Sequence, residues 1–178
     1  MRHQLAALAL ALAIATCYGA QAAEVGKKTV HTTLYDAAGK PVGTARLTQT
    51  PHGVLIRAEF TELPPGTHAF QIYETGKCEP PFTSAHDHFN PDDRQHGFLN
   101  PQGYHAGDLP NLHVPKSGAY TVEHLVTRAT LSLDGYTTLV GGDGTALIVH
   151  QGADDYETDP GGNAGKRIAC GVVMAKEE

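Results

Sequence analysis

Residues 53–60, GVLIRAEF, decide the fold of this chain. The even-numbered positions from 54 to 60 are all apolar, whereas Arg57 and Glu59 between them are charged. Alternation with a period of two is typical of a β-strand that has one face in the core and the other in water. Turn-forming residues bound the segment on both sides, PHG at 51–53 and PPG at 64–66. The segment therefore predicts a half-buried strand between two tight turns.

Further short strand candidates lie on both sides of this segment. They occur at 30–35, 68–74, 119–127, 145–150 and 168–174. The chain also has 20 glycines and 11 prolines, and no stretch shows the apolar period of a helix. We therefore predict an all-β fold, an antiparallel Greek-key β-barrel or sandwich.

The composition limits the class of protein. The chain has 178 residues, enough for a single domain with a core, and 40% of them are hydrophobic. Its net charge is −6, which argues against a nucleic-acid partner because phosphate contacts need a basic face. Eleven histidines stand out and direct attention to metal binding.

The N-terminus is predicted to be a secretory signal peptide spanning residues 1–22. Arg2 provides a basic start, residues 5–16 are apolar, and Ala-Gln-Ala at 20–22 resembles a cleavage site. A retained amphipathic anchor and a lipoprotein signal ending at Cys17 are the alternatives. We expect residues 23–178 to form a single periplasmic or secreted domain without a membrane span.

Two cysteines remain after such a cleavage, Cys78 and Cys170. In an exported protein a remaining pair is expected to form a disulfide. Because they lie far apart in the chain, the bond would close a long loop and stabilise the fold strongly.

Residues 74–112 break the strand pattern and form an irregular stretch of about 40 residues, which a compact domain rarely contains without a brace. Three histidines and one aspartate lie within it. Together they form a four-ligand nitrogen and oxygen set suited to a structural zinc site. The set is His88, His96, His105 and Asp108.

Seven motifs follow one another along the chain. They are GTHAF (66–70), SA (84–85), HFNP (88–91), HG (96–97), HAGDLPN (105–111), VH (149–150) and GNAGKRIACGV (162–172). In type and order they resemble the copper/zinc superoxide dismutases, and most closely the exported bacterial branch. The resemblance covers nearly all of the predicted mature chain.

This resemblance implies an eight-stranded Greek-key β-barrel and a disulfide between Cys78 and Cys170. It implies zinc on the four loop residues, with the residue at His88 also bridging to copper in active members. His150 matches a copper ligand, and Arg167 matches the arginine that guides superoxide. Asp154 matches the carboxylate that links the two metal sites, where it would orient ligands.

The sequence departs from the family at two copper ligands. The family has a His-x-His pair where this chain has Gln71 and Tyr73. An amide is a poor copper donor, and a tyrosine binds well only as phenolate, whose free pKa is about 10. The copper set falls from four histidines to two, His88 and His150, so we expect zinc to bind and copper binding to be weak.

Other interpretations of these positions remain open. Tyr73 as phenolate would favour ferric iron, and His86 could supply a further ligand. We prefer a structural interpretation, in which Gln71 hydrogen-bonds Asp154 and Tyr73 is a half-buried aromatic residue with a bonded hydroxyl.

The remaining histidines and acids are expected to be structural or solvated. His68 is predicted to be buried and hydrogen-bonded, and residues 154–159 to form a solvated acidic loop apart from the linking role of Asp154. Four further histidines are expected mostly at the surface. They are His31, His52, His113 and His124.

Three functions are compatible with the sequence. The first, which we favour, is an exported zinc-binding protein with little or no dismutase activity, because zinc does not cycle by one electron. The second is a dismutase with unusual ligands that converts superoxide to oxygen and hydrogen peroxide. The third is a copper-handling or protein-binding relative, suggested by fold analogy alone. Whether the protein forms a homodimer or has another protein partner is left open by the sequence.

Overall fold

The computed structural model describes residues 28–175, so the predicted signal peptide at 1–22 lies outside the described residues. One short 3₁₀ helix, η1 (Thr83–Ala85), accompanies the strands. The strands are β1 (Thr29–Asp36), β2 (Pro41–Thr50), β3 (Gly53–Phe60), β4 (Gly66–His68), β5 (Phe70–Tyr73), β6 (Leu112–Val114), β7 (Tyr120–Val126), β8 (Thr145–His150) and β9 (Arg167–Val173).

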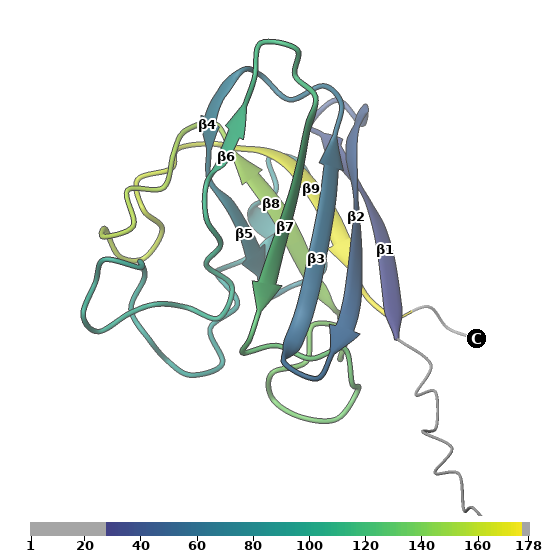
Figure 1. The fold of residues 1–178 in the computed structure, drawn as a ribbon, viewed down its shortest axis with the longest axis vertical. Coiled ribbons are helices and arrows are strands. Elements are labelled where there is room, and N and C mark those ends of the chain that lie inside the picture. The colour runs from purple at the N-terminus through teal and green to yellow at the C-terminus, as the bar shows by residue number, and fades with distance from the viewer. Residues whose placement is uncertain (1–27, 176–178) are drawn as a thin grey trace, which may run out of the picture.

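Seven strands form one curled antiparallel sheet in the order β5-β8-β9-β1-β2-β3-β7, and β4 pairs with β6 beside it (Figure 1). Only Ala69 separates β4 from β5, so the two form one bent strand and the chain has about eight in all. The prediction of an all-β Greek-key barrel is confirmed. The sequence pattern did not predict β2 or β6.

The central strand β3 behaves as its alternation predicts. Val54, Ile56 and Ala58 are fully buried in the core, and each such aliphatic side chain of Val or Ile size contributes about 1.5–3 kcal/mol. On the opposite face Arg57 forms ion pairs with Glu59 and, across the strand pair, with Glu123 on β7.

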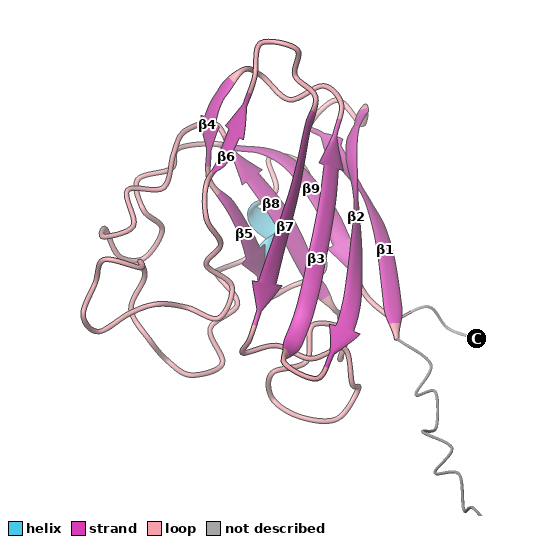
Figure 2. Cartoon of the chain, in the orientation of Figure 1, coloured by secondary structure: helices cyan, strands magenta, loops and turns pink. Residues whose placement is uncertain are grey.

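Two long connections lie together beside the barrel (Figure 2). One joins β5 to β6 through residues 74–111, and the other joins β8 to β9 through residues 151–166. They touch directly, because the Leu99 backbone N–H donates to the Tyr156 carbonyl at 3.0 Å. All four predicted metal ligands lie in the first of these connections.

The disulfide Cys78–Cys170 ties the start of the first connection to β9, across a sequence separation of 92 residues, with Cα atoms 5.6 Å apart. This confirms the predicted pairing. Within residues 28–175 no helix is long and apolar enough to span a bilayer.

Candidate metal centre

The four loop residues predicted to bind zinc converge in the structure. His88, His96, His105 and Asp108 are buried, and one ligand atom from each lies within 4.8 Å of the others. The Asp108 Oδ1 atom is 2.9, 3.0 and 3.2 Å from the Nδ1 atoms of His88, His96 and His105. The four residues predicted from the sequence to bind zinc therefore lie together in the folded chain.

These separations match the edges of a tetrahedron around a metal ion. With bonds of about 2.0–2.1 Å, neighbouring ligand atoms of a tetrahedral zinc lie about 3.3 Å apart. The Nδ1 atoms of His88 and His105 are 3.2 Å apart. Ring nitrogens this close to each other and to a carboxylate oxygen are stabilised when they share a cation.

The protonation of His96 supplies a second test of the fit. Its Nε2 lies 2.9 Å from Asp154 Oδ1, and its buried Nδ1 lies 3.0 Å from Asp108 Oδ1 without a well-aligned hydrogen bond. Although burial opposes protonation, these two carboxylates raise the pKa of His96 to about 9. A divalent cation such as zinc would replace the proton at Nδ1, where it would be shared with Asp108, so the donor set fits such an ion.

Asp108 has a second function in the loop. Although burial opposes ionisation, contact with the imidazoles of His105, His88 and His96 holds the pKa of Asp108 far below its usual range. Its Oδ2 accepts the backbone N–H groups of Gly97 and His105 at 3.1 and 3.0 Å. The same carboxylate thus orders the backbone that carries the histidines.

Gln71 and Tyr73 lie beside this cluster. Both side chains are buried on β5 and point away from the core residues Phe70 and Ile72, as expected for residues two apart on a strand. The Gln71 Nε2 donates to Asp154 Oδ2 at 2.7 Å. The predicted structural contact of Gln71 is thereby confirmed.

The hydroxyl of Tyr73 lies between two imidazoles. Its oxygen is 2.9 Å from His150 Nε2 and 3.1 Å from His88 Nε2. These two nitrogens belong to the two histidines that the resemblance implies as copper ligands. The predicted bonded hydroxyl is present, but Tyr73 is fully rather than half buried, at 2% exposure.

The direction of each hydrogen bond follows from the donors and acceptors. A backbone carbonyl only accepts, so neutral His150 donates from Nδ1 to Gly165 O at 3.0 Å. His150 Nε2 must then accept the Tyr73 proton, and the Tyr73 oxygen accepts the His88 Nε2–H. With its proton on Nε2, His88 presents the lone pair of Nδ1 to the cluster, where Asp108 Oδ1 lies 2.9 Å away.

Burial keeps these groups neutral. It raises the pKa of Tyr73 to about 12, although nearby Arg167 opposes the shift. It lowers the pKa of His150 to about 4 and lowers that of His88 despite the Asp108 contact. The phenol, the poorer form of tyrosine as a copper ligand, therefore dominates at neutral pH.

Arg167 and His86 meet at the rim of this site. The Arg167 guanidinium donates to the carbonyls of Phe82 and His86, both at 2.7 Å, and lies 4.1 Å above the Tyr73 ring. His86 thus contributes its backbone, while its side chain is exposed and outside the ligand cluster. The structure gives no support to His86 as a replacement ligand.

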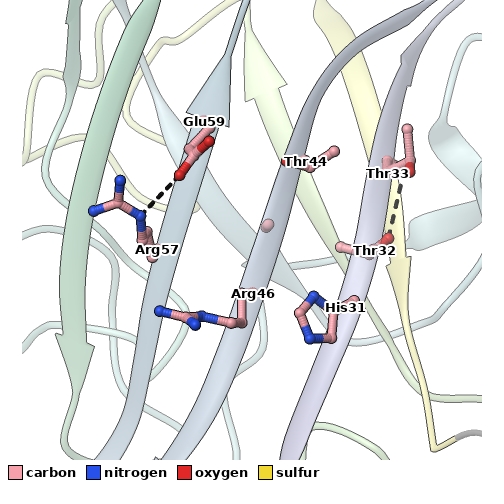
Figure 3. Close-up of a pocket in the computed structure, with 8 residues that line it drawn as sticks. His31, Thr32, Thr33, Thr44, Arg46, Arg57 and Glu59 are labelled. Carbon is pink, nitrogen blue, oxygen red and sulfur yellow. Dashed lines mark hydrogen bonds and ion pairs between the residues drawn. The ribbon is translucent and has the colours of Figure 1, made fainter.

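Two surface hollows differ in chemistry. One of about 400 Å³ opens over Tyr73, His88 and Arg167 and therefore gives access to the predicted site. Another, of about 560 Å³, lies on the outer face of β1, β2 and β3 around His31 and Arg46 (Figure 3). None of the predicted metal ligands lines the second hollow.

The acidic loop, residues 154–159, makes a contact with the metal cluster that the sequence did not predict. Asp159 Oδ1 accepts the His96 backbone N–H at 2.6 Å, so this carboxylate braces the cluster rather than being only solvated. Asn111 also anchors Asp154, through 2.9 Å bonds in both directions between its amide and the Asp154 backbone. The motif ending in Asn111 was the only sequence signal for this brace.

Of the remaining histidines, His68 is buried as predicted. Its ring nitrogens are both 2.8 Å from carbonyl oxygens, of His150 and Pro64. His124 departs from the expected surface position, because its ring packs toward Phe70 and its Nε2 is buried. The other three are exposed: His31, His52 and His113.

Comparison with known proteins agrees with the fold. The model of the family "Copper/zinc superoxide dismutase (SODC)" matches residues 42–173. Superoxide dismutase [Cu-Zn] 1 of Aquifex aeolicus is 50% identical over 145 residues, covering 80% of this chain and 86% of that protein. The superoxide dismutase-like protein YojM of Bacillus subtilis is 40% identical over 151 residues, covering 83% and 77%.

Solved structures agree as well. The crystal structure of a SOD-like protein from Bacillus subtilis has a TM-score of 0.77 at 39% identity and covers 81% of this chain and 97% of its own. The Cu/Zn superoxide dismutase of Brucella abortus has a TM-score of 0.64 at 27% identity, covering 83% and 100%. The fold and the histidine cluster define a metal-binding β-barrel. The chain belongs to the copper/zinc superoxide dismutase family.

Proposed function

We propose that this protein is an exported, zinc-binding member of the family with little or no superoxide dismutase activity. The observation that carries the proposal is the position of the Tyr73 hydroxyl, which is hydrogen-bonded to the Nε2 atoms of both His88 and His150. Those atoms are the ones that the residual copper site would need. The phenol satisfies them without a metal.

Zinc would be held by the Nδ1 atoms of the three loop histidines and by Asp108. A complete set of four protein ligands leaves no open position, so the ion would supply structural stability to the loop rather than chemistry. Its binding energy would contribute directly to the folding of residues 74–111.

To bind, copper would have to break the hydrogen bonds that Tyr73 makes with His88 and His150. It would gain two imidazoles, but Gln71 is engaged with Asp154 and offers only an amide. Tyr73, with a pKa raised to about 12, would have to lose its proton. Without a bound redox metal, Arg167 has no superoxide chemistry to assist.

Export is the remaining part of the proposal. The predicted signal peptide at 1–22 and the disulfide between Cys78 and Cys170 support a domain of residues 23–178 in the periplasm or outside the cell.

The test compares the mature protein with the double variant Gln71→His/Tyr73→His. Each is exposed to zinc and copper, desalted, and analysed for metal content and superoxide dismutation. We expect one zinc and no retained copper in the wild type, and copper with measurable dismutation in the variant. Near-stoichiometric copper in the wild type, with activity comparable to that of its relatives, would contradict the proposal.

A dismutase with unusual ligands is the second candidate. Arg167 and Asp154 are both present and engaged at the site, and relatives such as the Aquifex aeolicus protein carry the name superoxide dismutase. Iron or copper bound beside zinc in the wild type, together with activity that Tyr73→Phe abolishes, would favour this candidate.

A further inference from the structure

We propose that Gln71 and Tyr73 are positioning residues of the zinc site, each holding one of its histidines from the side opposite the metal. This inference rests on the proposed zinc binding and extends it. The two substitutions would then do more than weaken copper binding. They would strengthen the retention of zinc in a protein that has no copper to brace the shared histidine.

Tyr73 acts on His88. A histidine that binds a metal through Nδ1 carries its proton on Nε2, and a partner for that proton fixes both the tautomer and the ring plane. The Tyr73 oxygen lies 3.1 Å from His88 Nε2 and is itself held by His150. The two rings meet edge to face, with centroids 4.8 Å apart. His88 is therefore fixed by both a hydrogen bond and packing.

Gln71 acts on His96 through Asp154. One oxygen of the Asp154 carboxylate accepts from Gln71 Nε2 at 2.7 Å, and the other accepts from His96 Nε2 at 2.9 Å. All three side chains are buried, at 3% exposure or less. Loss of the Gln71 donor would leave a buried carboxylate oxygen unpaired and free the carboxylate to rotate away from His96.

The arrangement gives the two substitutions a common consequence. Tyr73 contacts one zinc ligand directly, and Gln71 contacts another through Asp154. Both side chains project from β5, a strand held in the sheet by its pairing with β8. A rigid strand positions ligands more accurately than a loop does. The long loop supplies the zinc ligands, and the barrel supplies the groups that orient two of them.

The experiment measures zinc release from the zinc-loaded protein to a coloured chelator. Tyr73→Phe removes only the hydroxyl, and Gln71→Leu removes only the amide. We expect each to release zinc about 10- to 100-fold faster than the wild type, the usual effect of losing an outer partner of a metal ligand. Tyr120→Phe, which removes the hydroxyl of a partly buried tyrosine on β7, is the control and should release zinc at the wild-type rate.

Two further measurements distinguish a change in the orientation of a zinc ligand from a general destabilisation of the site. Gln71→His keeps an N–H that can reach Asp154, so it should release zinc more slowly than Gln71→Leu. Cobalt substituted for zinc should show a shifted visible spectrum in Tyr73→Phe but not in Tyr120→Phe, because only the first alters the orientation of a ligand.

The outcomes are distinct from those of the proposed function. If the wild type holds zinc but Tyr73→Phe and Gln71→Leu release it at the wild-type rate, the inference is wrong and the proposed zinc protein stands. If the wild type binds no zinc, both are wrong. Faster release in both variants, with an unchanged Tyr120→Phe, supports the inference.

Discussion

At the scale of single residues, the hydroxyl group of Tyr73 lies between the imidazoles of His88 and His150. The Tyr73 phenol accepts one hydrogen bond and donates another, so its proton and its oxygen both have a hydrogen-bond partner. A buried polar group with satisfied hydrogen bonds resists displacement, because the interactions of an incoming ligand must offset the loss of both bonds. The hydrogen bonding of Gln71 is less complete, since its Oε1 is buried without a partner among the described residues.

His124 is partly buried, and its buried Nε2 leads to a prediction about pH. Burial lowers the pKa of His124, and its Nε2 has no hydrogen-bond partner within residues 28–175. A histidine whose folded pKa is depressed contributes stability above its unfolded pKa of about 6.5, and loses it as the pH falls toward the folded value. His124→Leu should therefore reduce the acid-side loss of stability.

Urea unfolding of the metal-free proteins at pH 8 and pH 5 provides the measurement. We expect His124→Leu to be within about 1 kcal/mol of the wild type at pH 8 and more stable than it at pH 5. His31→Leu, at an exposed histidine on β1, should leave the pH dependence unchanged. An identical pH dependence in His124→Leu and the wild type would refute the prediction.

At the scale of elements, the two long connections form a single braced unit. Gly97 lies at one point where they approach closely, with φ of +103° and an added Cβ only 2.1 Å from the Tyr156 carbonyl oxygen. Only glycine has both the backbone freedom and the small size for this position. Asp159 and Asn111 add hydrogen bonds between the same two connections.

Gly97→Ala should therefore separate the two connections. We expect a loss of at least ~2 kcal/mol relative to Gly39→Ala, together with poorer zinc retention. Gly39 is a matched control because its φ is also positive, at +80°, but an added Cβ there meets open space. Thermal unfolding and metal content of the two variants give the comparison, and equal effects would count against a close-contact origin.

At the scale of the whole molecule, the barrel and the loop depend on two cross-links of different kinds. The metal cluster would gather residues within the loop, whereas the disulfide joins the loop to β9. The barrel itself has a continuous apolar core, so we expect it to survive loss of the metal better than the loop does.

Cys78→Ser/Cys170→Ser tests the second cross-link. Closing a loop of this length is expected to stabilise the folded state by roughly 4 to 5 kcal/mol in the chain-entropy account. Denaturant unfolding of the oxidised wild type and the double variant should differ by about that amount. Reduced wild type should match the variant, and a difference near zero between the oxidised wild type and the variant would show that the bond constrains little.

The sequence alone determined the class of fold and the composition of the metal cluster. The two-residue alternation of β3 is local, and the spacing of His88, His96, His105 and Asp108 is readable in a single loop. The place of Gln71 and Tyr73 on one face of a strand was also predictable, because side chains alternate across a strand. Three of the four histidines expected mostly at the surface are exposed, and His124 is the exception because its neighbours, such as Phe70, come from other strands.

Only the tertiary structure decided what the two substituted residues contact. Tyr73 meets His150 from 77 positions away, and Gln71 meets Asp154 from 83 positions away. Hydrogen bonds of this kind form because β5 and β8 are adjacent in the sheet and the β8–β9 connection folds back over them. The resemblance to the family indicated that Gln71 and Tyr73 stand where copper ligands are expected. The folded chain was needed to reveal that these two side chains belong to a buried hydrogen-bond network around the metal cluster.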